Sequence, residues 1–401
     1  LTGQSGCNGA EPGFYVENQA SISQTACLAG SYNPFALATQ ASDCMLADFG
    51  HFVPLPGSIG QIECNPGNFS ANLGQITCDS AEPGYFVPSS GADAQLPCSI
   101  GTWQGSYGAT SCDFSSPGFY VDTTAASLQT ACNAGTFNQN SGSNNSADCL
   151  TADPGNYVPN PGSSEQILCT AGTYQPAPGQ SNCITADFGY HVPAEGATGQ
   201  IGCLMGSYQE NRGGTDCVLA EPGYYVDSHF ASSQTACLAG TYLPSSGSTS
   251  SNDCIDADRG YFVSENGADS QEACNIGTYQ PNEGSSICLI AEPGHYVDTQ
   301  ASSTQTACEA GTFNSDSGSN NQFACLDSEL GYYVPESGSV NQIECEVGSY
   351  QNLKKQTECK FASLGFFVNS TAAKSQIPAP INFYIDTEGA TEQLPFQQGT
   401  I

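Results

Sequence analysis

The sequence predicts a small disulfide-rich tandem repeat. We expect an elongated rod or solenoid of about ten modules of 34 or 37 residues, with short β-hairpins and little or no helix. Three observations support this. The chain has 21 cysteines in 401 residues. From Cys7 to Cys359 the steps between successive cysteines alternate between 20 and either 14 or 17. Two aromatic signatures recur at fixed distances from these cysteines.

The cysteine spacing defines units that are too short to bury a hydrophobic core alone. Below about 40 residues, disulfides, metals or neighbouring units usually supply the missing stability. A disulfide that closes a loop of this size contributes roughly 3 kcal/mol. Because so many disulfides persist only in an oxidising compartment, we expect an extracellular or cell-surface protein.

The first signature is Gly-aromatic-aromatic-Val, as in Gly223 to Val226. Pro precedes six of its eleven glycines, and Pro-Gly predicts a type II turn because Pro presets φ and Gly accepts a positive φ. The aromatic pair that follows is prone to form a short strand. The signature glycines are Gly13, Gly50, Gly84, Gly118, Gly155, Gly189, Gly223, Gly260, Gly294, Gly331 and Gly365.

The second signature is Gly-[Thr/Ser/Asn]-aromatic, which begins three residues after alternate cysteines. Aromatic rings at fixed repeat positions usually pack, so we expect each ring to cover a disulfide or to lie on the next module. The ten aromatic residues of this signature are Tyr32, Phe69, Trp103, Phe137, Tyr174, Tyr208, Tyr242, Tyr279, Phe313 and Tyr350.

A glutamine recurs three residues before the first cysteine of each short loop, and Gln376 keeps this place where the expected cysteine is Ala379. An amide can donate and accept, so we expect these residues to act as structural hydrogen-bond posts. They are Gln24, Gln61, Gln95, Gln129, Gln166, Gln200, Gln234, Gln271, Gln305 and Gln342.

Two nearest-neighbour pairings of the cysteines are open. Long-loop pairing begins with Cys7–Cys27 and leaves Cys359 alone. Short-loop pairing leaves Cys7 alone, and we favour it because Gln4 to Cys7 matches the end of an internal unit, which suggests that the chain begins inside a module. The spacing does not fit the close Cys pairs of a zinc site. The short-loop pairs are Cys27–Cys44, Cys64–Cys78, Cys98–Cys112, Cys132–Cys149, Cys169–Cys183, Cys203–Cys217, Cys237–Cys254, Cys274–Cys288, Cys308–Cys325 and Cys345–Cys359.

The repeat predicts a division of the chain. Residues 1–7 would end a truncated module, 360–379 would form a degenerate half module, and 380–401 an extended tail. Ile381 to Asp386 alternates like a strand, whose free edge could pair with this chain or the next; the alternative is the start of a further domain or a loose tail. The ten complete modules are 8–44, 45–78, 79–112, 113–149, 150–183, 184–217, 218–254, 255–288, 289–325 and 326–359.

The run of Cys, Gly-Thr-Tyr, a loop, Cys and Pro-Gly-Tyr-Tyr-Val resembles the ephrin-receptor-like (GCC2/GCC3) cysteine-rich repeat, which is similar to tumour-necrosis-factor-receptor modules. The resemblance covers residues 1–379. It implies elongated ectodomains with short β-hairpins and with adhesive, stalk or fibrous roles. This chain departs from the family in having only two cysteines per unit, without extra Cys-x-x-Cys pairs between modules.

The formal charge is −33, from 6 basic and 39 acidic residues. This charge excludes nucleic acid and anionic membrane surfaces as partners. No apolar run approaches the roughly 20 residues that a membrane-spanning helix needs, so we expect no membrane insertion. Four of the six basic residues, namely Lys354, Lys355, Lys360 and Lys374, lie near the C-terminal end. Together with the acidic remainder they suggest head-to-tail self-association.

An acidic residue precedes the turn in nine of the eleven copies of the first signature. One carboxylate per module is too few for calcium, which takes six to eight oxygens, so we expect turn capping or solvation, with weak calcium binding as the alternative. The nine residues are Glu11, Asp48, Glu82, Asp153, Asp187, Glu221, Asp258, Glu292 and Glu329.

His51, His191 and His295 replace aromatic residues of the first signature. We expect them to pack, because they lie modules apart and so do not suggest a metal or catalytic constellation. No nucleophile elbow, phosphate loop or paired-carboxylate motif is visible. The sequence therefore predicts a protein that is not an enzyme and needs no cofactor.

Three Asn-x-Ser/Thr sequons, at Asn68, Asn144 and Asn369, suggest a glycoprotein. The function we expect is that of a structural subunit or segment of an extracellular fibre, stalk or surface appendage, with filament neighbours and glycans as partners. The alternative is a ligand-binding or adhesive receptor ectodomain, with or without calcium.

Overall fold

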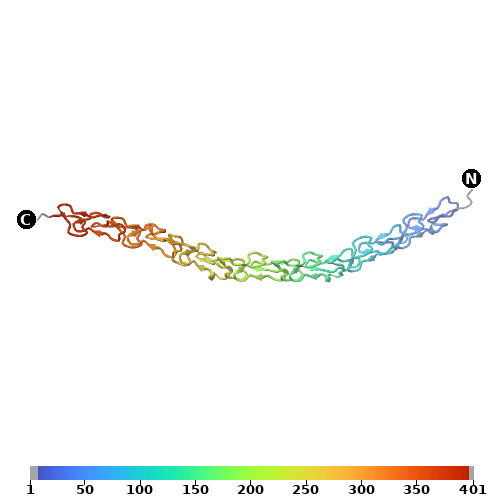
Figure 1. Ribbon diagram of the computed structural model, residues 1–401. Helices are drawn as coiled ribbons and strands as arrows, with labels where there is room; N and C mark the ends of the chain where they lie inside the picture. The colour runs from blue at the N-terminus through green and yellow to red at the C-terminus, as the bar shows by residue number, and fades with distance from the viewer. Residues whose placement is uncertain (1–7, 397–401) are drawn as a thin grey trace, which may run out of the picture. The chain divides into compact units, whose positions relative to one another are not determined.

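The computed structural model describes residues 8–396 (Figure 1). In this range 44 strands of two residues each pair into 22 antiparallel hairpins. The other regular elements there are four single-turn 3-10 helices. The prediction of ten disulfide-bonded modules of short hairpins with almost no helix is confirmed.

The hairpins form two alternating classes. Those that begin with the Gly-aromatic-aromatic signature are here named A-hairpins. They are β1–β2 (Phe14–Tyr15, Thr25–Ala26), β5–β6 (His51–Phe52, Ile62–Glu63), β9–β10 (Tyr85–Phe86, Leu96–Pro97), β13–β14 (Phe119–Tyr120, Thr130–Ala131), β17–β18 (Asn156–Tyr157, Ile167–Leu168), β21–β22 (Tyr190–His191, Ile201–Gly202), β25–β26 (Tyr224–Tyr225, Thr235–Ala236), β29–β30 (Tyr261–Phe262, Glu272–Ala273), β33–β34 (His295–Tyr296, Thr306–Ala307), β37–β38 (Tyr332–Tyr333, Ile343–Glu344) and β41–β42 (Phe366–Phe367, Ile377–Pro378).

The second class, here named B-hairpins, follows the first in strict alternation. Ten of its eleven members begin with the second signature. They are β3–β4 (Ser31–Tyr32, Met45–Leu46), β7–β8 (Asn68–Phe69, Asp79–Ser80), β11–β12 (Thr102–Trp103, Asp113–Phe114), β15–β16 (Thr136–Phe137, Leu150–Thr151), β19–β20 (Thr173–Tyr174, Ile184–Thr185), β23–β24 (Ser207–Tyr208, Val218–Leu219), β27–β28 (Thr241–Tyr242, Ile255–Asp256), β31–β32 (Thr278–Tyr279, Leu289–Ile290), β35–β36 (Thr312–Phe313, Leu326–Asp327), β39–β40 (Ser349–Tyr350, Lys360–Phe361) and β43–β44 (Phe383–Tyr384, Leu394–Pro395).

The structural repeat is half as long as the cysteine repeat. Strands β1, β3 and β5, which open three successive hairpins, begin at Phe14, Ser31 and His51. Each cysteine module therefore combines one A-hairpin with one B-hairpin. Strand β4 continues two residues past Cys44 and pairs with β3, so a boundary drawn between hairpins falls after Leu46.

The three-residue insertion of the longer B-hairpins folds into the 3-10 turns. Each turn ends directly before the second cysteine of its bridge. In the first turn, the Asp43 carboxylate accepts from the backbone N–H groups of Thr39 and Gln40, at 2.8 and 3.1 Å. These two N–H groups, Thr39 first, lower the pKa of Asp43. The turns are η1 (Ala41–Asp43), η2 (Ser146–Asp148), η3 (Ser251–Asp253) and η4 (Gln322–Ala324).

The Pro-Gly signature forms the predicted type II turn. The Phe14 N–H donates to the Glu11 carbonyl oxygen at 3.0 Å, and Gly13 has a φ of +88°. A hydrogen bond between the first and fourth residues, with a positive φ at the third, defines this turn. The same geometry recurs at Gly84, where φ is +89°.

Backbone hydrogen bonds connect each hairpin to the next two along the chain. The Gly84 N–H donates to the Gln104 carbonyl oxygen of the next hairpin at 2.7 Å. The Ala125 N–H, from the loop of the hairpin after that, donates to the Cys98 carbonyl oxygen at 2.8 Å. Equivalent bonds recur along the described residues. Two-residue strands make too few ladder bonds to stand alone, so these bonds between hairpins supply much of the order.

The interior of the stack alternates between a valine in the A-hairpins and, in eight of the eleven B-hairpins, an amide side chain; the exceptions are Ser70, Leu243 and Ile385. The residue after the first strand is a valine in A-hairpins, and Val87 and Val158 are fully buried. In B-hairpins the same place holds Gln175, which is 4% exposed and donates through Nε2 to the Asn182 carbonyl oxygen at 2.8 Å. Buried amides of this kind are stable only when they are hydrogen-bonded. The stacked hairpins therefore have a partly polar interior in place of a conventional hydrophobic core.

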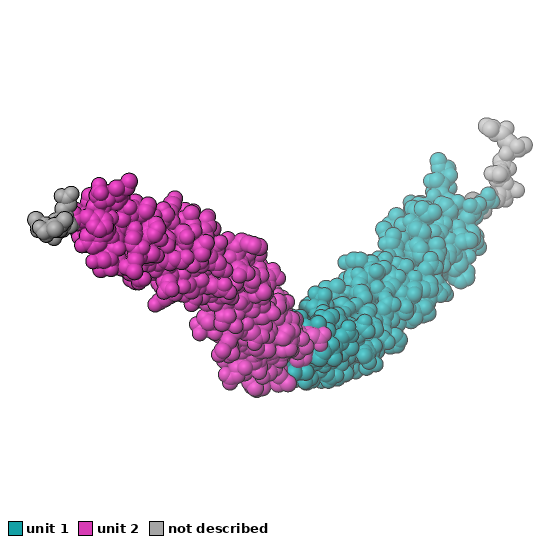
Figure 2. Space-filling model, turned by 60° about the vertical axis from the view of Figure 1, so that its left-hand side comes forward, with its two compact units in different colours: residues 1–187, 192–201, 213–215 teal, residues 188–191, 202–212, 216–401 magenta. Residues whose placement is uncertain are grey.

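The described chain divides into two compact units (Figure 2). The first comprises residues up to 187 with 192–201 and 213–215, and the second comprises 188–191, 202–212 and the residues from 216 onward. Within each unit the hairpins follow one another in chain order (Figure 1).

The prediction that the repeat stops near Ala379 and continues as a tail with an unpaired strand is wrong. Residues Phe383–Tyr384 pair antiparallel with Leu394–Pro395 of the same chain. The Ala379 N–H also donates to the Gly365 carbonyl oxygen at 2.9 Å, as cysteines do at this place in other hairpins. The alternation in Ile381 to Asp386 belongs to one more B-hairpin, which lacks cysteines. Residues 397–401 lie outside the described part of the chain.

In one B-hairpin a buried amide lacks the hydrogen-bond acceptor that the same amide has in two other B-hairpins. Asn138 donates through Nδ2 to Ser143 Oγ at 2.8 Å, and Asn314 bonds Ser319 in the same way. In the first B-hairpin the residue five places after Asn33 is Ala38. Asn33 is 1% exposed and its Nδ2 has no hydrogen-bond partner.

We predict that Ala38→Ser stabilises the first B-hairpin by about 1 kcal/mol, because the new hydroxyl accepts from the buried amide. Ser143→Ala should destabilise its own hairpin by at least as much. The measurement is local hydrogen exchange in each hairpin. Unchanged or faster exchange in Ala38→Ser would contradict this explanation.

We predict that Gly84→Ala destabilises its hairpin by roughly 2–4 kcal/mol. An alanine here would hold a positive φ, and its Cβ would overlap the Ala125 carbonyl oxygen. Hydrogen exchange of the Cys98 amide reports the loss. The matched control is Gly60→Ala, because no atom lies within 4 Å of the added Cβ. Equal effects of the two changes would show that the close approach is unimportant.

Candidate functional site

The structure joins the cysteines in ten short loops. Each bridge joins the residue four places before the first strand of a B-hairpin to the residue directly before its second strand, with Cα atoms 5.6–5.8 Å apart and a sequence separation of 14 or 17 residues. This is the short-loop scheme, from Cys27–Cys44 to Cys345–Cys359. Cys7 lies outside the described residues.

In each A-hairpin a glutamine occupies the place that the second cysteine occupies in a B-hairpin. Gln24 directly precedes the second strand of its hairpin, as Cys44 does in the next one. Its Oε1 accepts from the Glu11 N–H at 3.0 Å across 13 residues. All eleven A-hairpins have this bond, at 2.6–3.0 Å, between a glutamine and the residue two places before the turn glycine. The predicted role of these glutamines is therefore confirmed.

The acidic residues before the turns are partners of these glutamines. Gln61 Nε2 donates to Asp48 Oδ2 at 2.7 Å, and Gln234 Nε2 donates to Glu221 Oε2 at 2.9 Å. Eight of the nine predicted acids accept in this way, and the ninth, Glu329, gives only its N–H. Each of the eight carboxylates thus has a structural bond inside its own hairpin, which favours the capping interpretation over calcium binding.

The last B-hairpin has a glutamine in place of its second cysteine, as A-hairpins do, but this glutamine lacks its hydrogen bond. Ala379 and Gln393 occupy the places of its two cysteines. Gln393 would accept from residue 380, but this residue is proline, which has no N–H. Gln393 Oε1 is accordingly buried without a partner.

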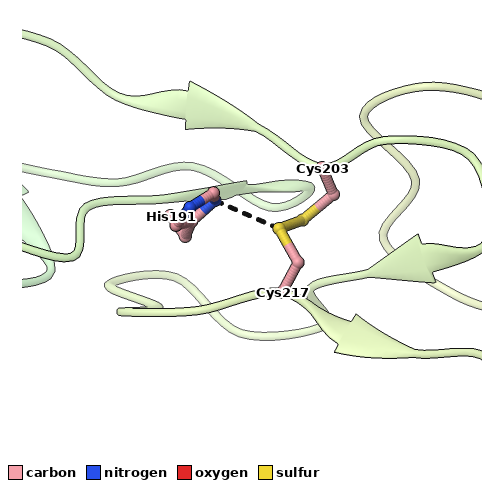
Figure 3. Close-up of side chains that lie close together, drawn as sticks. All are labelled: His191, Cys203 and Cys217. Atoms are coloured by element: carbon pink, nitrogen blue, oxygen red, sulfur yellow. Dashed lines mark hydrogen bonds between the residues drawn. A yellow bond between two sulfur atoms is a disulfide. The ribbon is translucent and has the colours of Figure 1, made fainter.

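One histidine lies against a disulfide. His191 Nδ1 is 3.1 Å from Cys217 Sγ in the Cys203–Cys217 bridge (Figure 3). One ring nitrogen and both sulfur atoms lie within 4.8 Å of one another. His191 and Cys217 are half-buried, and Cys203 is 1% exposed.

The other two histidines of the signature point elsewhere. His51 and His295 occupy the first aromatic slot, and their Nδ1 atoms contact the carbonyl oxygens of Phe49 and Pro293 at 3.0 and 3.3 Å. His191 occupies the second slot, which faces the disulfide. We predicted packing for all three residues and did not predict the cluster. The constant spacing between the second slot and the next cysteine could have indicated it.

The aromatic residues pack as predicted at the positions where contacts are resolved. A Cβ added at Gly57 would lie 3.3 Å from the Phe14 ring, so the first aromatic residue covers the loop of the next A-hairpin. Tyr225, in the second slot, lines one hollow with Cys237 and Cys254.

The three sequons differ in accessibility. Asn144 and Asn369 are exposed. Asn68 is half-buried in β7, and its Oδ1 accepts from Ser80 Oγ at 2.8 Å. The folded chain therefore presents Asn144 and Asn369 better than Asn68.

Among residues 8–396, no helix is long and apolar enough to cross a membrane. No protein-family model matches the chain, and no curated protein matches it. The resemblance to ephrin-receptor-like repeats therefore stays a prediction.

We predict that Ala379→Cys with Gln393→Cys forms an eleventh disulfide, because these places correspond to the cysteines of every other B-hairpin. The bridge should also remove the unpaired amide and slow hydrogen exchange in β43–β44. Peptide mapping of the unreduced variant identifies the bond. Two free thiols at these positions would contradict the proposed equivalence of glutamine and cysteine closures.

Proposed function

We propose that this chain is a structural segment of an extracellular fibre, stalk or surface appendage, built from ephrin-receptor-like modules and without catalytic activity. The observation that carries this proposal is the reach of the backbone hydrogen bonds. In both units each hairpin bonds the next two hairpins along the chain, as the bonds of Gly84 and Ala125 illustrate. Contacts limited to near neighbours let a repeat array grow by equal steps.

The closures support a load-bearing role. A disulfide ties the segment before the first strand to the residue before the second strand in each cysteine-bearing B-hairpin, and the glutamine bond does the same more weakly in each A-hairpin. Ten intramolecular disulfides also indicate an extracellular or secreted protein. Exposed Asn144 and Asn369 are the sites where we propose glycans.

Charge supports self-association. The basic residues gather near the C-terminal end of an otherwise acidic chain. Lys355 lies 3.5 Å from Glu309 in its own unit, and both side chains are at least half exposed. We propose that this end attracts acidic surface of a neighbouring copy, with a strength that falls as salt rises.

An adhesive or ligand-binding ectodomain is the second candidate. It is favoured by large apolar side chains on the surface, including Phe323 at 92% and Phe114 at 70% exposure. Exposed apolar residues that gather in one patch commonly mark interaction sites. In a receptor, ligand binding would depend on a few particular modules. In a stalk, the length would depend on the number of modules.

We predict that deletion of residues 153–186 leaves a folded chain with nine native disulfides. The cut removes one A-hairpin and one B-hairpin and joins Ala152 to Asp187, so it preserves the repeat register. In the native source, the appendage seen by electron microscopy should shorten by one step and keep its attachment.

The control removes residues 153–169 only, which leaves Cys183 without its partner and should give a misfolded product. An appendage of unchanged length after the larger deletion would contradict the stalk. Loss of ligand binding at unchanged length would support the receptor.

A further inference from the structure

We propose that the module around His191 is a redox-gated zinc site. When the Cys203–Cys217 bridge is reduced, the two thiolates and His191 Nδ1 bind one Zn²⁺ ion, and water completes the tetrahedron. Zinc prefers this combination of sulfur and imidazole ligands, and three protein ligands with one water make an open site.

The three candidate ligand atoms lie close together, with the two sulfur atoms directly bonded while the bridge is intact. One nitrogen and two sulfur atoms fall within 4.8 Å of one another. Tetrahedral zinc, with Zn–S near 2.3 Å and Zn–N near 2.0–2.1 Å, places its ligand atoms about 3.6–3.8 Å apart. After reduction the two sulfur atoms would have to move apart from bonding distance to this separation. Figure 3 shows the His191 ring beside the bridge.

Contacts other than the sulfur bond also hold the backbone around the site. The Cys203 N–H donates to the Gly189 carbonyl oxygen at 2.9 Å, and the Cys203 carbonyl oxygen accepts from Phe230 at 2.8 Å. The rings of Tyr190, which precedes the histidine in β21, and Phe230 stack 5.2 Å apart. These contacts favour retention of the hairpins after reduction, so that the three ligands stay close.

Reduction of the Cys203–Cys217 disulfide requires a reductant, and a dithiol supplies the two electrons. Its thiolate attacks one cysteine sulfur, the S–S bond breaks, and its second thiol resolves the mixed disulfide. The dithiol leaves oxidised, and two electrons and two protons go to the cysteines. Zinc then displaces both thiol protons, since only thiolates ligate the metal.

No other module has a histidine in this slot. The residue equivalent to His191 is Tyr or Phe in the other nine modules, as at Tyr157 and Tyr225. Reduction there yields two thiolates without a nitrogen ligand. The difference provides variants that exchange one native residue for another at equivalent places.

The test uses the full chain after limited reduction by a dithiol that is then removed under nitrogen. The opened bridges are located by alkylation and peptide mapping, and the chain is titrated with Co²⁺ and Zn²⁺. Wild type should take up one tightly held Co²⁺ with thiolate charge-transfer absorption, which Zn²⁺ abolishes. Zinc should also protect Cys203 and Cys217 from alkylation.

His191→Tyr removes a ligand and should weaken Co²⁺ binding by more than the roughly 10–100-fold that follows loss of a residue hydrogen-bonded to a metal ligand. Tyr157→His should add a second site at Cys169 and Cys183. Equal binding by wild type and His191→Tyr would overturn the proposal. So would a reduced chain in which zinc protects no cysteine pair, or protects all pairs alike.

Discussion

A link from the start of each hairpin to the residue directly before its second strand is the constraint on which this structure depends. A hairpin with two-residue strands cannot persist in water by its ladder bonds alone. In the B-hairpins a disulfide such as Cys64–Cys78 holds the ends together. In the A-hairpins the Gln61 carboxamide holds Asp48 in the same place. Covalent and hydrogen-bonded closures thus alternate along the chain.

The closed hairpins can then approach one another because glycine occupies the points of contact. Gly84 combines a positive φ with a position too close to a neighbouring carbonyl for any side chain. The same glycine donates its N–H to the next hairpin. Small valines and amides, most of them hydrogen-bonded, fill the remaining interior. Backbone packing of this kind needs little hydrophobic area, which is consistent with an acidic chain of modest apolar content.

Much of this architecture could be predicted from the sequence, because each feature depends on local residues at a regular spacing. Pro12-Gly13 predicted its turn, and the alternation of cysteines predicted the modules. The half-length repeat was missed because the two signatures differ in letters while sharing one backbone. Gln24 and Cys44 occupy the same place, but nothing in their chemistry suggests it. The loss of cysteines after Cys359 therefore looked like the end of the repeat, although the backbone pattern continues.

The contact of His191 with a disulfide was missed for a related reason, although the constant spacing between the second aromatic slot and the next cysteine could have indicated it. It depends on which face of β21 the second aromatic slot presents, and on the pairing of two cysteines 14 residues apart. Each of these two features is local in the sequence, but the contact between them depends on the three-dimensional fold. Equivalent places in other modules hold aromatic rings, which made substitution by histidine look neutral.

Mass-spectrometric mapping of the disulfides in unreduced native protein tests the central claim most directly. The account predicts only short-loop bridges, such as Cys27–Cys44 and Cys64–Cys78, each within one B-hairpin. Long-loop bridges, such as one between Cys44 and Cys64, would close the A-hairpins instead. That result would contradict the alternation of closures from which the rest of the structure follows.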